Sequence, residues 1–153
     1  MLSPAHVGAG SLEKVNPKDG TAELWTTGRR FEFGTRANSL LAGLGASLDW
    51  LTSLGWSKIE QHVAQMSGYL KAQILKRPYL RLLTPTSFAE SSGLTTFSIE
   101  GWAAGEISGL LRKNARIFVR VIPHYNAIRI STPCFVNEQD IDTLMSSLED
   151  IVG

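Results

Sequence analysis

Two short segments carry residue types that suit the recognition of anions. The first is Arg30–Arg36, in which the pair Gly34–Thr35 comes just before a predicted helix. Backbone N–H groups and a hydroxyl at a helix entrance can bind an anion such as a phosphate. The alternative is that Gly34 and Thr35 only shape the start of the helix, because N-caps of this kind are common.

The second segment is Ile128–Ser131, where Arg129 lies inside an apolar strand pattern. An arginine is costly to bury without a partner. Its planar fork suits a carboxylate that binds through both oxygens. Alternation along the strand leaves a second interpretation open, in which Arg129 faces solvent on an exposed side of a sheet.

Other chemistry has little support in this sequence. It contains no GxSxG, P-loop or HExxH motif, and no GxGxxG between a strand and a helix. His6, His62 and His124 lack ligand spacing, and His62 is expected on a helix surface. The single cysteine, Cys134, excludes an internal disulfide and a thiolate zinc site.

The overall charge and hydropathy narrow the class of protein. The net charge of +1, without a basic stripe, gives no support for a nucleic-acid partner. No apolar run is long enough to cross a bilayer, and the N-terminal residues do not resemble a signal peptide. We therefore expect a soluble, cytoplasmic protein with no membrane partner.

Two consecutive helices are predicted in the first half of the chain. Leucines recur at helical spacing over Asn38–Leu54, and Gly55 suits the end of that helix. The next helix is expected to begin at Ser57, the N-cap of a capping box with Glu60, and to run to about Lys76.

The remaining elements predict the fold class. They are strands over 80–83 and 94–99, a helix over 101–112, strands over 116–122 and 127–131, and a final helix capped by Asn137 with Asp140 at its third position. This order predicts an α+β domain, with a small, mostly antiparallel sheet and helices packed on one face. Residues 1–33 show no clear period, which indicates a disordered arm or a piece of a larger body.

Taken in order, these segments resemble the C-terminal region of pyridoxal-phosphate (PLP) enzymes of fold type I, in the class V aminotransferase group. That group includes cysteine desulfurases, isopenicillin N epimerase-like proteins and related lyases. The segments that carry the resemblance are Leu2–Gly8, Arg30–Arg36, the leucine-rich helix from Leu40, Val119–Pro123, Ile128–Ser131 and Phe135–Asp142. The resemblance implies that residues 1–36 are a remnant of the large PLP-binding domain and residues 37–153 the small C-terminal α+β domain.

The resemblance also implies roles for particular residues. Gly34 and Thr35 would contact the cofactor phosphate of the other subunit in a homodimer. Arg129 would bind the α-carboxylate of an amino-acid substrate. His124 and Tyr125 closely precede Arg129 and could line the substrate pocket, or they could form a plain turn in which His124 is exposed.

The chain departs from the family in lacking the lysine that forms the Schiff base with PLP, which lies upstream in the family. None of Lys14, Lys18, Lys58, Lys71, Lys76 and Lys113 lies in that sequence context. We therefore expect no covalently bound PLP and no activity from the isolated chain. Its expected protein partner is a second copy, in a homodimer, or a complementing large-domain chain. The alternative function is a non-catalytic binding or partner subunit that retains this fold.

A second departure concerns the reaction. In cysteine desulfurases a nucleophilic cysteine precedes the carboxylate-binding arginine, whereas the corresponding region, Arg112–Arg116, has no cysteine and Cys134 follows Arg129. Desulfurase activity is therefore not expected, and epimerase, lyase or aminotransferase chemistry remains.

Overall fold

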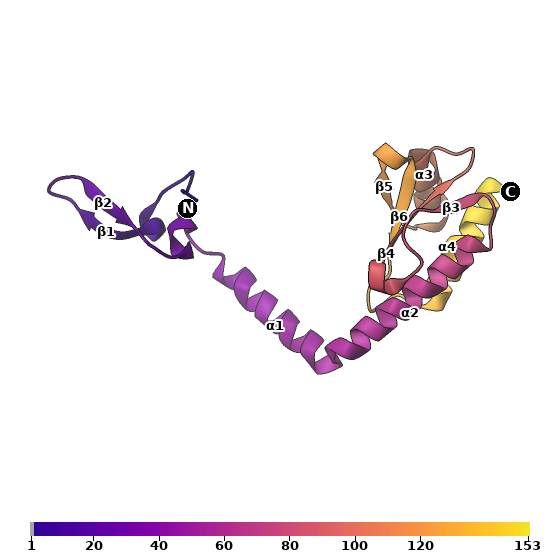
Figure 1. The fold of residues 1–153 in the computed structure, drawn as a ribbon, viewed down its shortest axis with the longest axis horizontal. Helices are drawn as coiled ribbons and strands as arrows, with labels where there is room; N and C mark the ends of the chain where they lie inside the picture. Colours follow the sequence, from indigo (N-terminus) through magenta and orange to yellow (C-terminus); the bar gives the residue numbers. More distant parts are fainter. Residues whose placement is uncertain (1) are drawn as a thin grey trace. The chain divides into compact units, whose positions relative to one another are not determined.

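The computed structural model describes residues 2–153, which form two units divided between Leu51 and Thr52. The elements of the first unit are η1 (Ala9–Ser11), β1 (Leu12–Asn16), β2 (Thr21–Leu24), η2 (Gly28–Phe31) and most of α1 (Asn38–Leu54) (Figure 1). The helix α1 has the bounds that its leucine spacing predicts.

The hairpin of β1 and β2 lies in the segment where the sequence shows no clear period. Its strands pair antiparallel, and Gly20 in the connecting turn has a φ of 72°. The carboxylate of Asp19 accepts hydrogen bonds from the backbone N–H and the hydroxyl of Thr21. An Asp-Gly pair between two short strands is a known hairpin signal, so this element was detectable from local sequence.

The helix α2 (Trp56–Leu75) opens the packed part of the second unit. Its N-cap is Gly55, which has a φ of 92°, and the backbone N–H of Lys58 donates to the Gly55 carbonyl. The predicted N-cap at Ser57 is therefore wrong, because Ser57 already lies within the first turn. The positive φ at Gly55 fixes where the helix starts, and few residues other than glycine adopt it readily.

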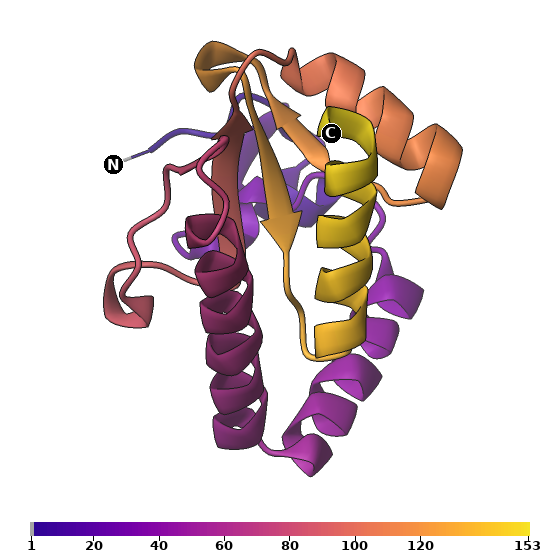
Figure 2. The same ribbon diagram turned by 90° about the vertical axis from the view of Figure 1, so that its right-hand side faces the viewer.

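The second unit contains one antiparallel sheet with the strand order β3-β4-β6-β5. Its further elements are β3 (Leu80–Leu82), η3 (Phe88–Glu90), β4 (Leu94–Ile99), α3 (Ala104–Ala115), β5 (Arg120–Ile122), η4 (Pro123–Tyr125), β6 (Ala127–Ser131) and α4 (Glu138–Val152). Contacts join α2 to β3, β4 and α4, and α3 to β5, β6 and α4 (Figure 2). This arrangement confirms the predicted α+β class.

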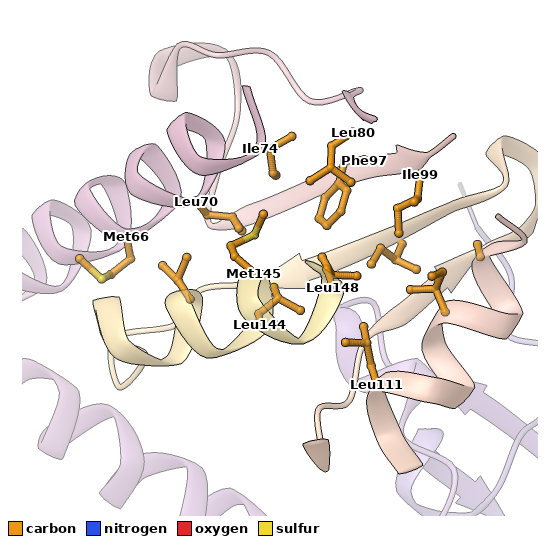
Figure 3. Packing of buried hydrophobic residues seen from close by; sticks show 14 residues of the cluster. Met66, Leu70, Ile74, Leu80, Phe97, Ile99, Leu111, Leu144, Met145 and Leu148 are labelled. Atoms are coloured by element: carbon orange, nitrogen blue, oxygen red, sulfur yellow. The ribbon is translucent and has the colours of Figure 1, made fainter. Parts of the chain in front are cut away.

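Alternating burial along β4 shows which sheet face carries the core. Thr95, Phe97 and Ile99 are buried, whereas Thr96 and Ser98 are half-exposed. The buried face meets apolar side chains of the helices (Figure 3); α2 supplies Met66, Leu70 and Ile74, α3 supplies Ile107 and Leu111, and α4 supplies Ile141, Leu144, Met145 and Leu148. The opposite face, called the outer face below, carries Thr96, Ser98 and their cross-strand neighbours.

The capping box predicted for the last helix is confirmed. The Asn137 side chain accepts from the backbone N–H of Asp140 at 3.1 Å, and the Asp140 carboxylate accepts from the backbone N–H of Asn137 at 3.0 Å. In the helix that follows, Ile141, Leu144 and Leu148 recur at helical spacing and are buried.

The helix α3 is shifted from its predicted range of 101–112. Its start at Ala104 is capped from a distant turn, because the Asn126 side-chain oxygen accepts from the Ala104 backbone N–H at 2.9 Å. It ends at Ala115, after which Arg116 adopts the left-handed conformation and the Ile117 N–H donates to the Leu111 carbonyl. This helix ending displaces the strand predicted over 116–122, which is reduced to Arg120–Ile122.

No helix in the described range 2–153 is both long and apolar enough to cross a membrane.

Candidate carboxylate-binding site

Arg129 lies in the middle of β6, between two neighbouring strands. It pairs with Thr96 of β4 on one side and with Arg120 of β5 on the other. Ile128 is buried in the core, and successive side chains of a strand point to opposite faces. The Arg129 side chain therefore belongs to the outer face, where it is half-buried.

The guanidinium of Arg129 has an unused donor. Its Nε is buried and has no hydrogen-bond partner among the described residues. Leaving a buried donor unpaired costs about 1–3 kcal/mol, and the cost is higher for a charged group. A buried donor without a partner requires an explanation, and an acceptor from outside the chain is one. A carboxylate would satisfy it, because the guanidinium fork matches the two oxygens.

Arg129 lines two cavities of the second unit. One, of about 530 Å³ on the outer face, is lined by Leu83, Thr84, Pro85, Thr96, Ile122, Tyr125 and Arg129. The other, of about 560 Å³, lies where β5 begins, and its lining includes Arg120, Arg129, Ile130, Asp140 and Leu144. Both are within the size range of small-molecule sites.

The β3–β4 connection forms one wall of the outer-face cavity and is held in place by hydrogen bonds. The Thr96 backbone N–H donates to the Thr84 hydroxyl at 2.8 Å. Further along, the ammonium of Lys71 donates to the Ser91 hydroxyl at 2.6 Å and to the Thr86 carbonyl at 3.4 Å. Lys71 is buried on α2, and this burial lowers its pKa below the ordinary lysine value.

His124 and Tyr125 differ in whether they line the outer-face cavity. Both lie in η4 and are exposed. Tyr125 lines the outer-face cavity with Arg129, whereas His124 is not among its lining residues. The sequence indicated both residues as possible pocket-lining residues, and of the two only Tyr125 lines this cavity.

Gly34 and Thr35 lie in the first unit, whereas Arg129 lies in the second. Both are exposed, and α1 begins only at Asn38, where the Leu41 N–H donates to the Ala37 carbonyl. The pair therefore precedes the helix rather than forming its first turn. A Cβ at Gly34 would meet nothing within 4 Å, so the backbone there is open to an approaching group.

His62 and Cys134, the other side chains considered for chemistry in the second unit, do not line the outer-face cavity. His62 is half-buried, and its Nε2 lies 2.8 Å from the Val136 carbonyl, which corrects its expected place on the surface. Cys134 is half-buried and follows β6. The described residues contain no cluster of three or more side chains that could hold a metal ion.

A four-stranded antiparallel sheet, covered by helices on one face and carrying an arginine with an unpaired donor on the other, defines an α+β domain suited to anion recognition. The chain belongs to the aminotransferase class-V family, whose pattern matches residues 1–144.

Similar proteins with curated names include cysteine desulfurases. A probable cysteine desulfurase of Streptomyces coelicolor is 28% identical over 80% of this chain and 32% of its own length. A cysteine desulfurase of Pectobacterium carotovorum is 25% identical over 98% of this chain and 38% of its own length. The chain thus spans about a third of the length of these relatives.

Solved structures support the same relationship. The cystine C–S lyase C-DES, in complex with its product cysteine persulfide, is 29% identical and superposes with a TM-score of 0.80 over 96% of this chain and 38% of its own. A C-DES mutant with glycine covalently linked to the PLP cofactor has a TM-score of 0.81, with 29% identity and the same coverage. The cysteine desulfurase of Thermococcus onnurineus, at 21% identity, shares the fold, with a TM-score of 0.84 over 97% of this chain and 39% of its own.

Proposed function

We propose that this chain supplies the substrate-binding part of a PLP-dependent class V enzyme that acts on an amino acid, and that Arg129 binds the α-carboxylate. The observation that carries this proposal is the buried, unpaired Nε of Arg129 beside a cavity. The similarity to C-DES, solved with an amino acid linked to PLP, supports it.

The residues of the first unit fit one part of the cofactor. Gly34 and Thr35 present exposed backbone and a hydroxyl in open space, which suits hydrogen bonding to a phosphate. We propose that they contact the PLP phosphate of a second subunit. When bound, PLP supplies an electron sink for reactions at the substrate Cα. This chain's own contribution is to orient the substrate through Arg129.

The helix α1 suggests where further polypeptide binds. None of its residues is buried, and the side chains of Leu40, Leu41, Leu44 and Leu48 are between 45% and 74% exposed. An apolar helical face of this kind normally packs against another element. We propose that a large PLP-binding domain covers it, supplied by a longer form of this chain or by a complementing chain.

The carboxylate site can be tested by titrating the 153-residue chain with butyrate while recording NMR signals of the arginine Nε–H groups. We expect a saturable shift of the Arg129 signal. The variant Arg129→Met should abolish saturable butyrate binding, followed through the backbone amides of β6. The matched control is Arg81→Met, because Arg81 pairs with Ser98 and therefore also lies on the outer face. Butyrate affinity that is unchanged in Arg129→Met would refute the proposed role.

A further inference from the structure

The sheet places a second arginine directly beside Arg129. Arg120 of β5 is the cross-strand partner of Arg129 on β6. Directly paired residues of an antiparallel ladder have their side chains on the same face, with Cβ atoms about 5 Å apart. Both arginines also line the cavity of about 560 Å³ at the start of β5.

The charge of this arginine pair is not balanced within the described part of the chain. Like charges directly opposite each other destabilise a sheet. Neither guanidinium forms an ion pair or a side-chain hydrogen bond with any residue in the range 2–153. Asp140 lines the same cavity, but its carboxylate accepts the Asn137 N–H in the capping box and is not ion-paired with either arginine in that range.

The cavity beside the arginine pair is bordered by apolar residues. The helix α3 ends at the left-handed Arg116, and β5 with its pairing to β6 begins only at Arg120. The apolar residues that line it are Ile117, Phe118, Val119, Ile130, Val136, Ile141 and Leu144. Ile141 and Leu144 come from α4, on the core side of the sheet, whereas the two arginines are paired on the outer face.

We propose that Arg120 and Arg129 together select an amino-acid substrate that carries a second carboxylate. This inference rests on the proposed function, in which Arg129 holds the α-carboxylate. Arg120 then binds the side-chain carboxylate and is the residue that determines specificity. A dicarboxylate removes the repulsion between the two arginines, whereas a monocarboxylate balances only one of the two charges.

The test compares succinate with butyrate, two four-carbon acids that differ in the second carboxylate. The 153-residue chain is titrated with each at constant ionic strength, and the Nε–H signals of Arg120 and Arg129 are followed. We expect succinate to bind about tenfold more tightly, because it adds one charge-assisted contact. The variant Arg120→Met should reduce the ratio of the two affinities to about one, because succinate then gains no second charge-assisted contact.

Two controls make the outcomes separable. Arg81→Met removes a charge from the outer face away from the pair and should keep the tenfold ratio, which excludes a general preference for divalent anions. Arg120→Gln should reproduce the result of Arg120→Met, with dispersed amide signals showing that each variant is folded. Equal affinities in the unmodified chain, with butyrate binding still dependent on Arg129, would overturn this inference alone. Butyrate binding that does not depend on Arg129 would overturn the proposed function as well.

Discussion

The helices α1 and α2 have comparable lengths, 17 and 20 residues, and both show leucine or related apolar residues at helical spacing. Their burial is opposite. None of the α1 side chains is buried, whereas Leu70 and Ile74 of α2 are completely inaccessible. Apolar periodicity therefore predicts a helix equally well in both cases, but it does not show whether the partner lies in the same chain.

The difference has an energetic consequence. Isolated helices of about 15 residues are marginal in water, and most of their stability in proteins comes from packing of an apolar face. The sheet and α4 provide that packing for α2. Because none of its side chains is buried in this chain, α1 gains little such stabilisation here, which fits the proposal that further polypeptide covers it.

The largest expected effect comes from applying one substitution to both helices. Leu70→Ala removes a fully buried side chain from the core (Figure 3) and should lower the free energy of unfolding by about 2–5 kcal/mol. Leu40→Ala removes a side chain that is 74% exposed and should change it by less than about 0.5 kcal/mol. Urea denaturation, followed by circular dichroism, measures both. Similar losses for the two variants would show that α1 packs against the rest of this chain.

A smaller effect on the free energy of unfolding is expected at the N-termini of α4 and α2, because only α4 begins with a side-chain cap. Asn137→Ala removes the hydrogen bond to the Asp140 N–H and should cost about 1 kcal/mol. The control is Ser57→Ala in α2, where Gly55 is the N-cap, so a change below about 0.5 kcal/mol is expected. Urea denaturation measures the free energy of unfolding of both variants. A loss of about 1 kcal/mol in Ser57→Ala would show that the Ser57 side chain caps α2 after all.

Local sequence predicted those elements whose ends depend on neighbouring residues. The bounds of α1, β4 and β6 follow from periodicity and alternation, and the Asn137 capping box follows from spacing. The start of α3 was missed because Asn126, 22 positions further along, caps it. Its end was missed because a non-glycine residue, Arg116, adopts the left-handed conformation there.

The candidate site shows the same division between local and non-local information. Arg129 was recognisable because an arginine in an apolar strand requires an explanation. Arg120 was not, since its importance comes from the register of β5 against β6, which strand patterns alone do not specify. The sequence could not distinguish Tyr125 from His124 as the pocket-lining residue, because the direction of a turn residue depends on the geometry of η4.

The smallest expected effect concerns Lys71, an ionisable residue on the buried face of α2 that has no counterpart on α1. Because desolvation lowers its pKa in the folded state, the unfolded chain holds this proton more tightly. The ammonium therefore opposes folding below the folded-state pKa. That cost is relieved as the pH rises from the lowered pKa towards the ordinary lysine value of 10.5.

Lys71→Met removes this titration while retaining a long, unbranched side chain. We expect the free energy of unfolding of Lys71→Met, minus that of the unmodified chain, to be more positive at pH 7.5 than at pH 10, by less than about 1 kcal/mol. Urea denaturation at the two pH values gives the difference directly, and groups that titrate alike in both proteins cancel. A difference that grows with pH would mean that the hydrogen bonds to Ser91 and Thr86 outweigh desolvation. The ammonium would then stabilise the wall of the Arg129 cavity.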